Sequence, residues 1–159
     1  MTDRQTIREV IAGAMDAEQR VDLMPPPYEK GMAIPNIALR AMRSHVQSEC
    51  ARFYTEPRLS QVTSILEIHL GEQQYAGSDR EVGGGVDSLT ITGLQVQGDT
   101  AIARADVVKW LDYIHFALDG AHVIHPPHLL ARYYFRLARS DFGWRISFED
   151  FNFPPGSGP

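Results

Sequence analysis

The last third of the chain reads as a run of β-strands joined by tight turns. Residues 87–116 and 129–153 alternate apolar and polar side chains, and turn residues interrupt the alternation at 98–99 and at 140–143. A period of two broken in this way is typical of antiparallel hairpins. Because successive side chains of a strand point to opposite faces, the pairing register decides which polar residues share a face with the core.

Helices are predicted ahead of these strands, over residues 3–20, about 35–53 and about 59–70, with prolines between them and a polar, glycine-rich loop over 71–85. Helices followed by an antiparallel sheet make an α+β domain. We expect residues 1–32 to form an N-terminal helix and a proline-rich connection. Residues 33–153 would then form a single domain whose helices pack on a curved antiparallel sheet, and residues 154–159 a disordered tail.

Charge and cysteine content exclude several classes of protein. The net charge is −5 and no cluster of Lys and Arg appears, which disfavours a nucleic-acid partner. The charged N-terminus lacks the apolar run of a signal peptide or a membrane span. The single cysteine, Cys50, excludes an internal disulfide framework and suits a reducing compartment, so we expect a cytoplasmic protein.

Two turns set the expected register of the sheet. A four-residue loop at 140–143 and a two-residue turn at Asp119-Gly120 are both common hairpin connections. They predict these pairs: Leu137 with Ile146, Phe135 with Phe148, Tyr133 with Asp150, Asp106 with Tyr133, and Arg104 with Phe135. The two assignments agree on one apolar face, made of Ile102, Val108, Trp110, Ala131, Phe135, Leu137, Trp144, Ile146 and Phe148.

Four polar side chains are predicted to share this core-facing surface, namely Arg104, Asp106, Tyr133 and Asp150. Charges there are unfavourable unless they are paired and hydrogen-bonded. The register is most sensitive at Pro126-Pro127, since prolines do not donate to a strand ladder. A slip of one residue would send Arg104 and Asp106 to the other face.

The segments GDTAIARADVVKW and YYFRLARSDFGWRISFEDF resemble the nuclear transport factor 2-like superfamily, which includes the SnoaL-like cyclases and the limonene epoxide hydrolases. They are similar to its "Gly-Asp-x-Ala" strand start and its "F-x-L-x-R-x-D-G-G-W-R-I" signature, with Phe142 in place of the first glycine of the turn. The resemblance covers roughly residues 33–153. It implies a cone-shaped α+β fold with a deep pocket, and a homodimer that packs through the sheet.

One subgroup resemblance carries residue roles. Limonene epoxide hydrolase-like enzymes use an Arg-x-Asp pair and a later Asp, and Arg104-Ala105-Asp106 and Asp150 match these elements. The resemblance implies that one aspartate activates water while the other protonates the epoxide oxygen. The sequence departs from the pattern in the longer separation between the two aspartates, and the Tyr and Asn that help to hold the water are not identified.

These residues support two hypotheses of different classes. The first is a cofactor-independent cyclase, isomerase or epoxide hydrolase for a small hydrophobic molecule, with Asp106 and Asp150 as acid and base and Arg104 and Tyr133 as polarising groups. The second is a non-catalytic binding or assembly module in which the same residues form a buried ion-pair network. The expected pocket lining is Trp110, Phe135, Trp144, Phe148 and Met42.

Histidines offer two further candidates. His45, with Glu49 one turn on, is either a base with its orienting carboxylate or a histidine hydrogen-bonded in the core. His122, His125 and His128 could lie on one side of a polyproline-like stretch and bind a metal, or form a solvated rim of the pocket. Our prediction contains neither a metal nor an organic cofactor.

Overall fold

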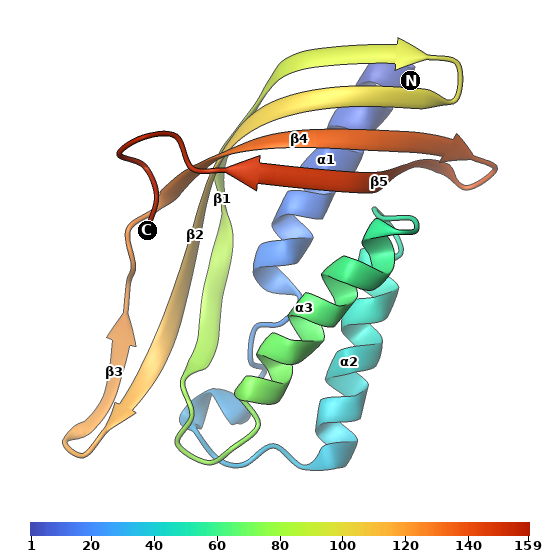
Figure 1. Cartoon of the computed structure of the whole chain (residues 1–159). Helices are drawn as coiled ribbons and strands as arrows, with labels where there is room; N and C mark the ends of the chain where they lie inside the picture. The colour runs from blue at the N-terminus through green and yellow to red at the C-terminus, as the bar shows by residue number, and fades with distance from the viewer.

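Three helices precede five antiparallel strands in the computed structural model, which describes residues 1–159 (Figure 1). The expected α+β class is confirmed. The elements are α1 (Asp3–Arg20), the short 3₁₀ helix η1 (Tyr28–Lys30), α2 (Asn36–Cys50), α3 (Arg58–Glu72), β1 (Arg80–Gln97), β2 (Thr100–Ala117), β3 (Gly120–Ile124), β4 (Leu129–Ser140) and β5 (Gly143–Asn152).

Helix α1 begins at a capping box. The side chain of Thr2 accepts the backbone N–H of Gln5, and the side chain of Gln5 accepts the backbone N–H of Thr2 in return. Residues at helical spacing along α1, such as Ile7 and Ile11, are fully buried against the sheet. None of the helices is both long enough and apolar enough to span a lipid bilayer.

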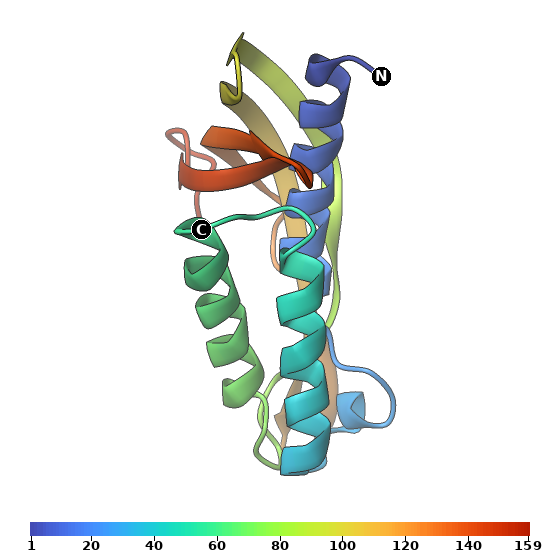
Figure 2. The ribbon, with the colours of Figure 1, turned by 90° about the vertical axis from the view of Figure 1, so that its right-hand side faces the viewer.

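The sheet has the strand order β1-β2-β4-β5, and β3 pairs with the far end of β2 along the edge that β4 also uses. The pairing of β1 with β2 shifts at three points, between Glu81 and Gly83, Val86 and Ser88, and Ile91 and Gly93. Such irregularities bend a strand and increase its twist. In Figures 1 and 2 the sheet accordingly curls over the helices, with α1 against β1 and with α2 and α3 below β4 and β5. Residues 71–79 of the expected 71–85 loop contain no strand. The predicted end of the loop is wrong, because β1 begins at Arg80.

The core lies between the helices and the inner face of the sheet, the face turned toward them. Every second residue of the central strands points there, as the alternation predicts. The buried hydrophobic residues of the strands are Ala101, Ala103, Ala105, Val107, Ala131, Tyr133, Phe135, Leu137, Trp144 and Ile146.

The predicted register between β2 and β4 is wrong by one residue. Tyr133 pairs with Ala105 and Phe135 pairs with Ala103, where the sequence predicted Asp106 and Arg104. As a result, Arg104 and Asp106 point to the outer face of the sheet, away from the helices.

The physical reason lies on both sides of β3. The turn after β2 pairs Ala117 with Gly120, so its two central residues are Leu118 and Asp119 and not Asp119 and Gly120. Residues 125–128, which contain Pro126-Pro127, then stand opposite only three residues of β2 (110–112). The net offset of one residue reverses the face of every β2 side chain relative to the prediction.

The pairing of β4 with β5 is confirmed next to its turn and wrong beyond it. Leu137 pairs with Ile146 as predicted, but the register shifts by one residue between Leu137 and Arg136. From there, Tyr133 pairs with Phe151 and not with Asp150. This bulge turns Phe148 and Asp150 to the outer face and places Glu149 on the inner face.

The contact of α1 with β1 at Gly84 gives the first testable prediction. A Cβ atom at Gly84 would lie 2.2 Å from the backbone oxygen of Gln19, so α1 would have to move. We expect Gly84→Ala to lower the free energy of unfolding by about 2–3 kcal/mol. Gly93→Ala is the matched control, because the nearest heavy atom to a Cβ in this other part of β1 is 4.0 Å away. Equal losses for both variants in denaturant titrations would contradict this account.

Candidate functional site

A cavity of about 290 Å³ lies between α1, α3 and the inner face of the sheet. Apolar side chains of α3 and the strands form part of its wall, and titratable groups form the rest. Its lining residues are Glu18, Gln19, Asp22, Arg58, Val62, Ile65, Leu66, His69, Glu81, Lys109, Leu111, Tyr133, Glu149 and Phe151. An apolar cavity with a few converging polar groups is the usual form of a small-molecule site.

The first group of polar residues centres on the buried carboxylate of Glu149. The Nη2 of Arg58 donates to the Oε1 of Glu149 at 2.7 Å, and the two side chains are 15% and 1% exposed. The hydroxyl of Tyr54 lies 2.5 Å from Oε1 of Glu18 and 3.2 Å from Oε2 of Glu149. Burial, and then the charge of Glu149, raise the pKa of Glu18 well above its usual value.

Four elements bring this network together. Glu18 lies in the last turn of α1, Tyr54 follows α2, Arg58 begins α3, and the bulge in β5 turns Glu149 inward. Tyr54 is fixed by an isolated parallel bridge to Ile146. The network therefore links each of the three helices, or its end, to the last strand.

The second group is formed by Asp22, His69 and Glu81. Nδ1 of His69 lies 3.7 Å from Oδ2 of Asp22, and one ligand atom of each residue lies within 4.8 Å of the others. Burial, and then the charge of Asp22, raise the pKa of Glu81 to about 8, and burial also raises the pKa of Asp22. Two carboxyl groups this close together do not ionise independently, because the charge of one opposes ionisation of the other.

Asp22 follows the end of α1, His69 lies near the end of α3, and Glu81 lies at the start of β1. The backbone of Glu81 is held on both sides, because its N–H donates to the side chain of Gln73 and its carbonyl accepts from Met24. One imidazole and two carboxylates are also ligands that suit a divalent ion. These three residues are the group that could hold a metal in this structure.

The third group is Lys109 with Tyr133. Nζ of Lys109 donates to the hydroxyl of Tyr133 at 2.8 Å and lies 4.7 Å from the ring centroid of Phe151. Burial lowers the pKa of Lys109 and raises the pKa of Tyr133. Tyr133 thus faces the cavity, on the inner face where the sequence analysis placed it.

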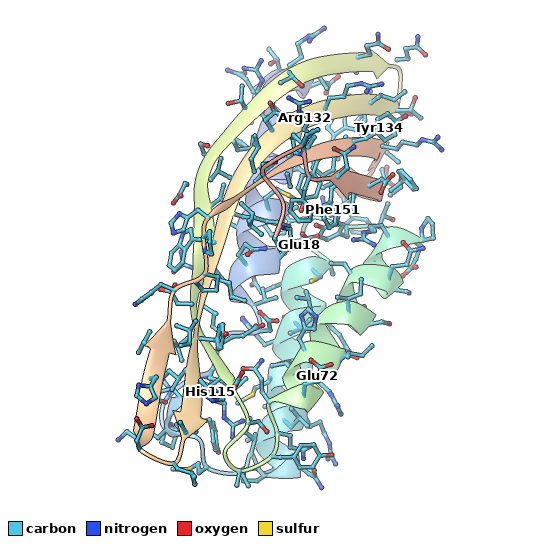
Figure 3. All side chains as sticks on the ribbon, turned by 60° about the vertical axis from the view of Figure 1, so that its left-hand side comes forward. Glu18, Glu72, His115, Arg132, Tyr134 and Phe151 are labelled. Carbon is cyan, nitrogen blue, oxygen red and sulfur yellow. The ribbon has the colours of Figure 1, made fainter.

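The three other residues predicted with Tyr133 lie on the outer face because of the register shifts. Arg104, Asp106 and Asp150 line a surface hollow of about 370 Å³. Nε of Arg132 is 3.5 Å from Oδ1 of Asp106. In Figure 3, Arg132 and Tyr134 stand on the side of β4 away from Glu18. Arg104, Asp106 and Asp150 thus remain close together but outside the cavity, and the catalytic role expected for them stays a prediction.

None of the five expected pocket-lining residues lines the cavity. Phe135 and Trp144 are buried in the core, and Met42 packs against it. Trp110 and Phe148 lie on the outer face, where Trp110 stacks on His128 and Phe148 is 39% exposed. For these last two residues the predicted face is wrong, for the reasons of register given above.

The histidine candidates are not brought together. His45 is exposed, because the buried side of α2 is made of Leu39, Val46 and Cys50. His122, His125 and His128 lie beside three different carboxylates, those of Asp119, Asp112 and Asp87 respectively. Their imidazoles therefore do not form one ligand set in this structure.

Sequence reasoning missed seven titratable residues of the cavity, namely Glu18, Asp22, Arg58, His69, Glu81, Lys109 and Glu149. Glu18 and Asp22 continue the spacing of the buried residues of α1, so the pattern carried a signal for both. Lys109 lies between inward-facing Val107 and Leu111, and would have been found with the correct register. No sequence signal marks Glu81 or Glu149 as inward-facing residues.

No protein-family model and no curated protein sequence matches the chain. Solved structures do match over almost its whole length. A nuclear transport factor 2-like superfamily protein from Salmonella enterica is 15% identical, with 98% of this chain and 94% of that chain covered and a TM-score of 0.55. The intermembrane space region of the chloroplast protein ARC6 is 12% identical, with 97% and 98% covered and a TM-score of 0.54.

A third structure is a candidate aromatic ring hydroxylase from Novosphingobium aromaticivorans, which is 17% identical, with 95% of this chain and 88% of that chain covered and a TM-score of 0.50. At these identities the likeness concerns the fold. The chain has the nuclear transport factor 2-like fold, as the sequence resemblance implies, and the subgroup is not resolved.

The raised pKa of Glu81 gives the second prediction. The group ionises at about 4.5 when unfolded and at about 8 when folded, so the folded state binds the extra proton between these values. The free energy of unfolding should therefore fall as pH rises through this window, and Glu81 should account for about 1–3 kcal/mol of the fall. Denaturant titrations from pH 4 to 9 measure this, and Glu81→Gln should flatten the curve. Glu9→Gln, at an exposed position, is the control. The assignment would be refuted if the free energy of unfolding depended on pH in the same way in Glu81→Gln and in Glu9→Gln.

Proposed function

We propose that this chain binds a small, largely apolar molecule in the cavity between α1, α3 and the sheet and catalyses proton transfer on it. The observation that carries the proposal is the Asp22–Glu81 carboxyl pair, which opens onto a cavity with apolar walls. The reaction class is isomerisation, cyclisation or hydrolysis without an organic cofactor.

The pair has the properties that acid–base catalysis requires. An efficient catalytic acid or base has a pKa near the working pH, and Glu81 meets this condition with a pKa of about 8. His69 borders Asp22 and is 45% exposed, so it offers a route for the proton to solvent. Glu18, whose pKa burial also raises, lines the same cavity and offers a second carboxyl group to the substrate.

The walls indicate the chemistry of the molecule. Val62, Ile65, Leu66, Leu111 and Phe151 offer apolar contacts from two sides, and the volume is at the small end of the usual range for ligand sites. These properties favour a compact, uncharged molecule with one or two oxygen atoms.

The test is a panel of small cyclic ketones, enones and epoxides, screened for thermal stabilisation and for turnover. Glu81→Gln should lower kcat/KM at least 100-fold on any substrate found, since it removes the exchangeable proton. Exposed Glu9→Gln, on α1 outside the cavity, is the matched control and should retain activity. Ligands that bind in the cavity without turnover would replace this proposal by the alternative, a non-catalytic binding module.

We also propose a cytoplasmic location and a homodimer that packs through the outer face. The apolar side chains of Ile102 and Phe148 are both 39% exposed there, among the charges of Arg104, Asp106 and Arg132. A face of this mixed character suits a second copy of the chain. Light scattering should give twice the mass of the chain, and Phe148→Asp should lower it; a monomeric mass of the unmodified protein would rule the dimer out.

A further inference from the structure

We propose that Lys109 is a nucleophile that forms an imine with a small aldehyde or ketone bound in the cavity. This inference rests on the proposed function, because it assigns a substrate class to the same cavity. It gives a role to a lysine that the acid–base proposal leaves unused.

Lys109 is placed as such a nucleophile must be. It lies on the inner face of β2 between Val107 and Leu111, is partly buried and lines the cavity. Its Nζ has one hydrogen-bond partner, the hydroxyl of Tyr133 at 2.8 Å, and lies over the rings of Tyr133 and Phe151. No carboxylate oxygen lies within the 4.0 Å of an ion pair with this amine.

Burial favours the neutral form of the Lys109 amine. Burial lowers the pKa of Lys109, and this effect exceeds the opposing attraction of the carboxyl groups of Glu18 and Glu149. Of these two carboxyl groups, that of Glu149 is already paired with Arg58. A lysine desolvated in this way is the form that attacks carbonyl carbon.

The choice of lysine supports the same inference. The chain has fifteen basic residues, and Lys30 and Lys109 are its only lysines. Arginine, which always stays charged, is used at Arg58 to neutralise Glu149. At Lys109 the cavity instead presents the basic side chain that can lose its proton.

The chemistry balances without an oxidant or reductant. The lone pair of Nζ bonds to the carbonyl carbon, and the carbonyl oxygen takes a proton through the hydroxyl of Tyr133, 2.8 Å from Nζ. Nitrogen then forms the C=N bond while the hydroxyl group leaves with a second proton as water. The amine and the carbonyl compound thus give an imine and one water molecule, and the imine makes the adjacent C–H more acidic for the cavity carboxyl groups.

Reductive trapping tests the inference. The full-length protein is treated at pH 7 with butanal and cyanoborohydride, which converts an imine into a stable butyl-lysine, and the labelled peptides are quantified by mass spectrometry. We expect labelling at Lys109 at least ten times faster than at exposed Lys30, which is the internal control in the same molecule. Equal or slower labelling of Lys109 would overturn the proposal, whether or not any variant folds.

Variants separate this proposal from the proposed function. Lys109→Arg should lose the fast label and Lys30→Arg should keep it, while Tyr133→Phe should slow it several-fold. Glu81→Gln should leave it unchanged, since Glu81 acts on the substrate and not on the amine. Fast labelling with no turnover of any substrate would support the imine and reject acid–base catalysis. Turnover that depends on Glu81, without preferred labelling of Lys109, would support acid–base catalysis and reject the imine.

Discussion

The ion pair between Arg58 and Glu149 is the contact on which the arrangement of helices and sheet depends. The bulge in β5 buries the carboxylate of Glu149, and a buried charge is stable only with a close partner. Arg58 supplies that partner from the first turn of α3, and Tyr54 joins Glu149 to Glu18 of α1. These contacts hold the start of α3 against the sheet.

Patterns of local sequence were sufficient for the class of fold and for most element limits. Helical spacing located α1, and alternation located the buried side of β4, because both depend only on which residues avoid water. Register depends on single residues. The sheet differs from the prediction at the bulge near Ser147, at the turn Leu118-Asp119 and at the extra residue of 125–128, and none of these disturbs the alternation enough to be visible in the sequence.

The two register errors explain which part of the predicted site survived. Each error shifts a strand next to β4 by one residue relative to the prediction. Asp106 and Asp150 therefore both lie on the outer face, while Tyr133 of β4 lies on the predicted inner face. The predicted side of the sheet is therefore wrong for Asp106 and Asp150, which both line the hollow on the outer face. Glu149, next to Asp150 in sequence, took the inward position. A one-residue bulge thus decides whether Glu149 or Asp150 faces the cavity. The amino-acid composition of β5 does not reveal this, because it is the same with or without the bulge.

The distribution of buried charge favours a functional cavity over a purely structural one. Asp22, Arg80 and Glu149 are the charged residues buried from solvent, and two of the three line the cavity. Breaking a buried ion pair is destabilising, but well-packed apolar residues in its place are often at least as stable, so stability alone does not account for these charges. Here they gather with Glu81 and Lys109, whose pKa values burial moves in opposite directions, up for the carboxyl group and down for the amine. Both shifts bring the groups toward the pH at which protons can be exchanged, which is what catalysis in such a cavity requires.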